Sequence, residues 1–397
     1  MAFFRNFSER AEQFVIEVMN KRELHGFKRW FRYFLFFLSR LYRNAVQFRL
    51  SLYNTGILRQ RVLGCFVVSV GNLTTGGTGK TPVVELIAKT LAERGKNVAV
   101  LSRGYRSKPR PILERIKSML SGNVEFVPPR LVSDGQKVLL DSSVAGDEPF
   151  MLARNLVATK ERSGVMVVVD RDRFKAGTYA IRKGADTLIL DDGFQYLRLR
   201  PWTNIMLVDS TNPFHNHEML PAGMLREPIK NMRRADYIFL TKVTGQEDRF
   251  RHLRRFLKRH NPQAEIIECN HLPCYLQDVR DSEAILPLDA LKGRKAATVC
   301  AIAVPQSFED YVTGLGAEIV YKKHFADHHR YNQHEIEAVC RKARESGADY
   351  IITTEKDAVR LPPLPSDSLP FLFLRVEIRI LSGKEHFDKC IQQICLG

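Results

Sequence analysis

A glycine-rich segment that ends in lysine and threonine is the strongest chemical signal in this chain. It covers residues 74–81 (TTGGTGKT) and lies between an apolar run, 65–70, and a helical pattern, 80–94. Glycines let the backbone turn sharply and point N–H groups at phosphate oxygens, and a helix N-terminus adds the positive end of its dipole. The sequence therefore predicts a loop that cradles phosphate groups.

Individual residues of the loop have predicted roles. The residues predicted to contact a nucleotide are Thr75, Gly76, Gly77, Thr78, Gly79, Lys80 and Thr81. Lys80 would reach the β- and γ-phosphates of ATP, and the Thr81 hydroxyl would ligate Mg²⁺. The usual pattern has glycine where this chain has Thr74, and the paired glycines are typical of variant loops. An incidental glycine-rich turn is the alternative, which the flanking strand and helix disfavour.

A magnesium site of this kind needs an acid at the end of a neighbouring strand. Asp191 and Asp192 follow the apolar run 187–190, and they could hold the metal or cap a turn with Gly193. Asp170 ends another apolar run and competes for the same role. The sequence leaves open which of these carboxylates meets the metal.

The elements that must position these residues alternate between apolar runs and helical patterns. Residues 65–262 predict a P-loop domain, an α/β fold in which helices cover both faces of a parallel sheet. Residues 295–397 predict a second, smaller α/β domain, and the proline-bearing stretch 263–294 is expected to be a linker. Residues 106–130 are basic and are expected to be a surface insertion. The further strands are predicted at 97–102, 165–170, 204–208, 236–240, 297–302 and 350–354.

The first 64 residues form a basic, aromatic-rich leader. The whole chain carries a net charge of +17, and residues 21–62 hold ten Lys/Arg against one acid. The longest apolar run there, 33–38, is far below the ~20 residues that span a bilayer. We expect an amphipathic helix lying in an anionic membrane interface. The alternative is a helix packed on the protein's own core with a solvated basic face.

Three other interpretations are disfavoured. The excess charge could suit nucleic acid, but no recognition helix, zinc finger or RNA-binding aromatic motif is present, so no nucleic-acid partner is expected. The seven cysteines are scattered, which predicts no disulfide framework and suits a reducing compartment. Cys269 and Cys274 flank His271 without matching a common zinc motif, so metal binding there is not expected.

An ordered set of motifs resembles one family, the tetraacyldisaccharide 4'-kinases that act on lipid A precursors in Gram-negative bacteria. The set covers most of 65–360. Its segments are VGNL (70–73) before GGTGKTP, SRGY (102–105), GDEP (146–149), DDGFQ (191–195), LPAG (220–223), LREP (225–228), FADHH (325–329) and TTEKD (353–357).

The resemblance implies transfer of the γ-phosphate of ATP, with Mg²⁺, to the 4'-hydroxyl of a tetraacylated glucosamine disaccharide 1-phosphate. That acceptor is a membrane-embedded glycolipid, so the resemblance also implies the cytoplasmic face of the inner membrane, reached through the N-terminal helix. It further implies two α/β/α domains with the active site between them.

The resemblance also carries residue roles. Asp147 matches the family's proposed catalytic base, and His328 matches the residue that pairs with it, which would help because an aspartate is a weak base at its ordinary pKa of about 3.9. Asp191 and Asp192 match the acidic strand end. Glu148 lies beside Asp147 and is expected to help bind the nucleotide, and Arg226 and Glu227 match residues near the phosphates. The family's active-site arginine falls on Arg171 or Arg173, and local pattern favours Arg173. Taken alone, Asp147 would be a helix cap and His328 a surface loop residue.

Some positions depart from the family or allow another interpretation. Tyr196 stands where the family often has His, and Arg200-Pro201 replaces a common Arg-Asp pair. Lys242 follows an apolar strand, which suggests contact with the nucleotide base or ribose, although a solvated lysine is the alternative. The rival function is a membrane-associated P-loop ATPase switch that has no sugar-lipid acceptor and no need of the Asp147–His328 pair.

Overall fold

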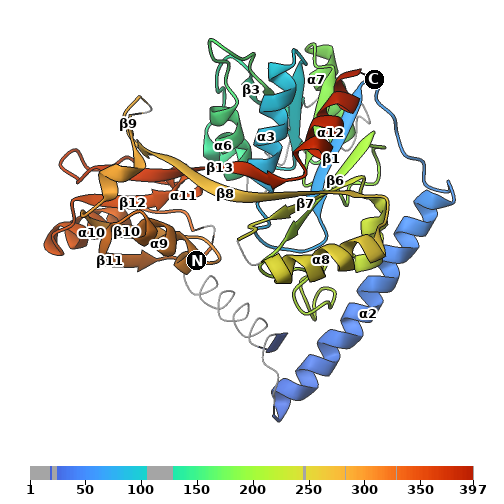
Figure 1. Ribbon diagram of the computed structural model, residues 1–397, viewed down its shortest axis with the longest axis horizontal. Coiled ribbons are helices and arrows are strands. Elements are labelled where there is room, and N and C mark those ends of the chain that lie inside the picture. Colours follow the sequence, from blue (N-terminus) through green and yellow to red (C-terminus); the bar gives the residue numbers. More distant parts are fainter. Residues whose placement is uncertain are drawn as a thin grey trace.

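A computed structural model gives the fold and describes residues 18–19, 25–104, 128–244, 247–281, 283–327 and 329–396. Within these ranges thirteen strands form one sheet, in the order β11-β10-β12-β13-β8-β7-β6-β1-β5-β2-β4-β3, with β9 paired to β8. Figure 1 shows the sheet continuing from one half of the molecule into the other. The predicted leader 1–64 and insertion 106–130 are each described only in part.

One half contains the phosphate loop. Its strands are β1 (Phe66–Asn72), β2 (Val98–Ser102), β3 (Arg130–Asp134), β4 (Met166–Val169), β5 (Thr187–Asp191), β6 (Thr203–Asp209) and β7 (Tyr237–Thr241). All neighbouring pairs are parallel except β3 with β4. The central strands β1, β2 and β5 are largely apolar because both of their faces are buried. The expected α/β architecture is confirmed.

Helices cover both faces of this half. One face packs against α3 (Lys80–Glu93), α6 (Asp147–Asn155) and α12 (Lys384–Leu396). The other face packs against α7 (Arg173–Arg182) and α8 (Glu247–His260). The short elements α5 (Ser142–Ala145) and η1 (Ile229–Arg234) complete this half.

The second half is a smaller α/β unit joined to the first through two long strands. It holds β10 (Lys295–Cys300), β11 (Glu318–His324), β12 (Tyr350–Thr354), α9 (Pro305–Gly314), α10 (Gln333–Glu345) and α11 (Glu355–Ala358). The joining strands, β8 (Glu265–Asp278) and β13 (Phe371–Ser382), run antiparallel, with β8 also paired to β7 and β13 to β12. The sheet is therefore continuous across the molecule.

The stretch expected to be a linker, 263–294, instead carries β8, β9 (Ile285–Leu286) and η2 (Leu288–Leu291). The linker was predicted from its prolines, but Pro273 is compatible with a strand. It lies at a register shift in the β8–β13 pairing, where a bulge tolerates a residue without an N–H. The end of the chain also differs from expectation, since α12 packs back onto the phosphate-loop half.

The N-terminal segment forms the 28-residue helix α2 (Phe27–Asn54), which runs along one side of the body in Figure 1. One face docks on the body, where Ser39 Oγ donates to the Met219 carbonyl at 2.9 Å and the Tyr42 hydroxyl donates to the Arg226 carbonyl at 3.2 Å. Another face is an apolar stripe, called here the aromatic stripe because five of its six residues are aromatic. Each member is at least half exposed: Phe27, Trp30, Phe34, Phe37, Leu41 and Phe48. Among the described residues, no helix is both long and apolar enough to cross a membrane.

The structural role of β8 can be tested by truncating two leucines on it. Leu276 is fully buried, so Leu276→Ala should lower the free energy of unfolding by about 2–4 kcal/mol. Leu272 on the same strand is 44% exposed, so Leu272→Ala should cost under about 1 kcal/mol. Urea unfolding of both variants measures the difference. Equal, small effects would indicate that this stretch is a linker after all.

Candidate active site

The phosphate loop turns around the side chain of Asn72 at the end of β1. Asn72 Nδ2 donates to Thr74 Oγ1 at 3.2 Å and to Thr78 Oγ1 at 3.0 Å. Lys80 Nζ donates to Asn72 Oδ1 at 3.4 Å. Gly76 is exposed, as is Gly77 beside it, and a Cβ built on either glycine would meet nothing within 4 Å. The turn is thus fixed from inside while its tip stays open to a ligand.

Neighbouring segments brace the loop from outside. Thr75 N–H donates to the Met224 carbonyl at 2.8 Å, which ties the loop to the segment 219–228. From the end of β7, Thr241 Oγ1 donates to the Thr78 carbonyl at 2.9 Å, and Lys242 Nζ donates to a further loop carbonyl at 3.1 Å. Lys242 also pairs with Asp209 Oδ2 at 2.6 Å. In this structure the lysine therefore serves the loop, and its predicted nucleotide contact stays a prediction.

The last glycine of the loop lies against a histidine from the joining strand β8. Gly79 has φ 78°, the left-handed region that favours glycine, and a Cβ there would come within 2.8 Å of His271 Cε1 and Nε2. Burial, reinforced by the nearby Lys242 charge, lowers the His271 pKa from 6.5 to about 4. The loop thus rests on a neutral imidazole.

The two acids at the end of β5 have different environments. Asp191 is buried and accepts a hydrogen bond from Ser102 Oγ at 3.0 Å. Burial first, then the charges of Glu148 and Asp192, raise the Asp191 pKa to about 6. Asp192 receives both Arg226 Nη atoms at 2.8 Å, and Lys80 Nζ lies 3.7 Å away. Although burial opposes it, the hydrogen bonding from Arg226 holds the Asp192 pKa well below its usual range.

The sheet order separates Asp170 from these acids. β5 is adjacent to β1, and Asp191 lies in register with Val70. Asp170 follows β4, which is the third strand along from β1. The strand that neighbours the loop therefore ends in the Asp191–Asp192 pair.

One of the two candidate arginines lies beside the acidic pair. Arg173 is 4% exposed, with Nη2 3.5 Å from the Asp191 carbonyl and its guanidinium 5.3 Å from the centre of the Tyr196 ring. Arg171 is exposed. Buried Nε atoms of Arg173 and of Arg226 have no hydrogen-bond partner in the described part of the protein. Unpaired cationic donors of this kind suit an anionic ligand.

Asp147 lies at the start of α6 and faces the second half of the molecule. Its carboxylate is buried and accepts hydrogen bonds from Arg360 Nε at 2.8 Å and Arg330 Nη2 at 3.0 Å. Gly146, not Asp147, is the N-cap of the helix. His328, the predicted partner of Asp147, lies outside the described residues. The pairing with the two arginines was not predicted from the sequence.

The residues next to Asp147 and Arg226 differ in where they point. Glu148 lies 3.8 Å from Lys356 of the second half, and its charge helps raise the pKa of Asp191. It therefore lies between the two halves. Glu227 instead pairs with Arg234 at 2.7 Å and accepts a hydrogen bond from Asn231 at 2.7 Å. The structure brings Arg226 to the loop but holds Glu227 in a buried pair against η1.

Several residues of the site were not singled out by sequence reasoning. Asn72, Ser102 and Arg360 contact the loop or the acids, and the first two fall inside the motifs VGNL and SRGY. Their presence in those motifs was the available signal. Arg360 lies just outside TTEKD, and nothing in the sequence pattern joins it to Asp147.

The donor set suits magnesium better than zinc. Within the described ranges no group of three or more His, Cys, Asp or Glu side chains could hold a metal, and all seven cysteines are free thiols. Magnesium in nucleotide enzymes uses one or two carboxylates with substrate phosphates, so it needs no such group. Asp191 meets this need. It is a buried carboxylate with a raised pKa, and a bound cation would lower that pKa.

Comparison with known proteins adds independent information. The sequence model of the family described as tetraacyldisaccharide-1-P 4'-kinase matches residues 31–396. The tetraacyldisaccharide 4'-kinase of Syntrophus aciditrophicus is 38% identical over 357 residues, 87% of this chain and 88% of that protein. The Geobacter metallireducens protein of the same name is 39% identical over 332 residues, 83% of this chain and 88% of its own.

A solved structure is also similar. LpxK from Aquifex aeolicus, crystallised in complex with ATP, matches with a TM-score of 0.68 and 28% sequence identity. The match covers 92% of this chain and 99% of that one. The likeness thus extends over both halves of the molecule.

The neutral His271 behind the loop predicts a pH-dependent stability. Its folded pKa of about 4 lies below its unfolded value of 6.5, so the unfolded chain binds the extra proton between these values. The contribution of the neutral His271 to the free energy of unfolding is complete above pH 6.5 and is lost as the pH falls towards 4. The loss is about 2.5 kcal/mol at pH 4.5. Urea unfolding without nucleotide should show a smaller acid loss in His271→Gln.

The matched control is His334→Gln, because the His334 side chain is 96% exposed. That variant should follow the wild type at both pH 7 and pH 4.5. An acid loss in His271→Gln as large as that of the wild type would contradict a neutral buried imidazole.

Proposed function

The chain belongs to the tetraacyldisaccharide-1-P 4'-kinase family, and from that premise we propose how its own residues carry out the phosphoryl transfer. It is an ATP-dependent kinase of lipid A biosynthesis. The acceptor is the 4'-hydroxyl of a tetraacylated disaccharide 1-phosphate. The observation that carries the proposal is the open loop at 76–77, backed by Lys80 and the Asp192–Arg226 pair. The rival, an ATPase switch without a sugar-lipid acceptor, is not favoured.

Charge neutralisation is the main task in phosphoryl transfer, because the transition state is loose and spreads charge over the equatorial oxygens. Lys80 in the loop and Arg173 beside the acidic pair supply positive charge. The loop glycines Gly76, Gly77 and Gly79 supply backbone donors, because the Thr75 and Thr78 N–H groups already donate to the Met224 and Gly76 carbonyls. Asp192 does not compete with the phosphates, because Arg226 occupies both of its oxygens. It instead forms an ion pair with Lys80 at 3.7 Å.

The residues that would hold magnesium are Thr81 and Asp191. Asp191 is the better candidate of the two acids, since its carboxylate is not engaged by an arginine while that of Asp192 is. Bound there, the ion would neutralise charge on the β- and γ-phosphates. Ser102 keeps the Asp191 carboxylate oriented by its hydrogen bond.

Asp147 is the proposed base. The acceptor oxygen bonds to the γ-phosphorus, the bond to ADP breaks, and the hydroxyl proton passes to the Asp147–His328 pair. Arg360, with a fully buried side chain, orients one carboxylate oxygen. Arg330 is 44% exposed and reaches the other oxygen from the surface, so it can yield that oxygen to the acceptor hydroxyl.

The reaction itself can be tested with labelled ATP and the disaccharide 1-phosphate acceptor in detergent. Asp147→Asn should lower kcat by about 10²–10⁴-fold, the usual contribution of a positioned base. The half-exposed Asp388 on α12 provides a matched control, and Asp388→Asn should retain the wild-type rate. No label in the lipid fraction with wild-type protein would defeat the function. Equal label with Asp147→Asn would defeat only the base assignment.

We further propose that α2 holds the enzyme at the cytoplasmic face of the inner membrane. The docked face of α2 is covered by the body, but the aromatic stripe is exposed, and the same helix carries exposed basic residues such as Arg40 and Arg43. Aromatic side chains enter the acyl boundary while arginines meet anionic headgroups. An acceptor anchored in the bilayer would then present its sugar to the loop.

Removing the stripe should release the protein from membranes. The triple variant Trp30→Ser, Phe34→Ser and Phe37→Ser should bind phosphatidylglycerol-containing vesicles at least about tenfold more weakly, because each aromatic contributes apolar area. Trp202→Ser removes a 68% exposed aromatic outside α2 and serves as the control. Unchanged cosedimentation of the triple variant would reject the role of α2.

A further inference from the structure

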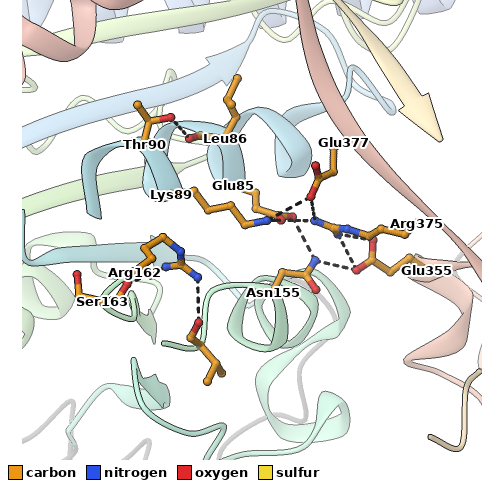
Figure 2. Close-up of polar contacts among 11 residues, drawn as sticks. Glu85, Leu86, Lys89, Thr90, Asn155, Arg162, Ser163, Glu355, Arg375 and Glu377 are labelled. Atoms are coloured by element: carbon orange, nitrogen blue, oxygen red, sulfur yellow. Dashed lines mark hydrogen bonds and ion pairs between the residues drawn. The ribbon is translucent and has the colours of Figure 1, made fainter. Parts of the chain in front are cut away.

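A buried cluster of polar side chains joins the two halves of the molecule away from the phosphate loop. It comprises Arg375, Glu85, Glu355 and Asn155, called here the junction cluster. Figure 2 shows the four side chains converging from four different elements. Arg375 lies on β13, Glu85 on α3, Glu355 at the start of α11 and Asn155 at the end of α6.

Each polar group of the cluster has a defined partner. Arg375 Nη1 donates to both carboxylate oxygens of Glu355, at 2.9 and 2.8 Å, and Arg375 Nη2 donates to Glu85 Oε1. Asn155 Nδ2 donates to Glu85 Oε2 at 3.1 Å and to Glu355 Oε1 at 2.7 Å. One guanidinium and one amide therefore bridge the same two carboxylates.

Burying these charged side chains costs desolvation free energy. Arg375 is 4% exposed and Glu85 5%. Burial acts to lower the Arg375 pKa, but the charges of Glu355 and Glu85 outweigh it and hold the pKa above its ordinary value. A buried ion pair stabilises a fold no better than well-packed apolar side chains do, so its presence is weak evidence for a stabilising role. What it does fix is the relative placement of four elements.

Those elements lead directly to the active site. α3 begins at Lys80, the lysine of the phosphate loop. α6 begins at Asp147 and ends at Asn155, so the cluster fixes the far end of the helix that carries the proposed base. α11 carries Asp357, whose Oδ1 accepts from Arg360 at 3.2 Å, and Arg360 in turn holds Asp147 at 2.8 Å. Both ends of α6 are thus tied to α11.

We propose that Arg375 is a positioning residue: the junction cluster sets α6 and α11 against α3 and so holds Asp147 at its working distance from the loop. The proposal rests on the proposed function, because it acts through Asp147. Arg375 touches no reacting atom. Its effect is on the placement of the base, which predicts a loss in kcat without a loss in ATP affinity.

The test is Arg375→Lys, because a lysine ammonium cannot span Glu355 and Glu85 as the guanidinium fork does. The expected kcat is at least tenfold lower, with the Kd for ATP within twofold and Tm within a few degrees of wild type. Arg379→Lys on the same strand is the matched control, since Arg379 is exposed, and it should leave kcat unchanged. Asn155→Ala keeps every charge of the cluster and should reproduce the kcat loss if Arg375→Lys folds poorly.

A double-mutant cycle identifies the route of the effect. In an Asp147→Asn background, Arg375→Lys should cost less than threefold, because the base that it positions is gone. Equal losses in both backgrounds, a full kcat in Arg375→Lys and Asn155→Ala, or parallel losses of ATP binding and Tm in both variants would overturn the positioning role alone. A full kcat in Asp147→Asn would instead overturn the base assignment, and this proposal with it.

Discussion

The pairing of Arg226 with Asp192 is the interaction on which the rest of the site depends. The guanidinium occupies both carboxylate oxygens and also reaches the Asn72 carbonyl at 3.2 Å, so it connects β5, β1 and the segment 219–228. That segment covers the loop through Thr75 and receives α2 through Met219. The charge pair inside the site and the helix outside it are therefore held by the same stretch of backbone. We therefore expect a shift of α2 against the segment 219–228 to move the phosphate loop.

The departure of the loop from the usual pattern has a structural explanation. Thr74 stands where glycine is usual, and it is buried, pairs with Leu225 in an isolated bridge and accepts a hydrogen bond from Asn72. It lies before the tip of the turn, and its contacts hold the base of the loop in place. Two loop positions require glycine for their backbone conformation: Gly76, with φ 108°, and Gly79, with φ 78°. At Gly79 the His271 side chain also leaves no room for a Cβ.

Local patterns predicted most of the first half of the molecule. The central strands of the parallel sheet are largely apolar runs, so β1, β2 and β5 were found within two residues of their observed ends. Lys80, Asp191 and Asp192 follow from loop chemistry, and the motifs indicated Arg173. Contacts between distant segments were not predictable. Asp147 meets Arg360, 213 positions away, and β8 contains a proline at a bulge, which resembles a loop in sequence. Such pairings depend on the order of strands, which no local pattern encodes.

The return of α12 to the first half affects how the protein is made. Phe387, Cys390, Ile391 and Ile394 fill the same core as Val83, Ile87 and Leu91 of α3. During synthesis α3 leaves the ribosome long before α12 is translated. The part of the α3 surface that packs on α12 therefore stays uncovered while the second half is made. Because contacts between distant segments form late and leave apolar surface exposed meanwhile, the nascent chain has reason to need a chaperone until its closing helix arrives. That face of α3 is therefore covered only after residues 384–396 have emerged.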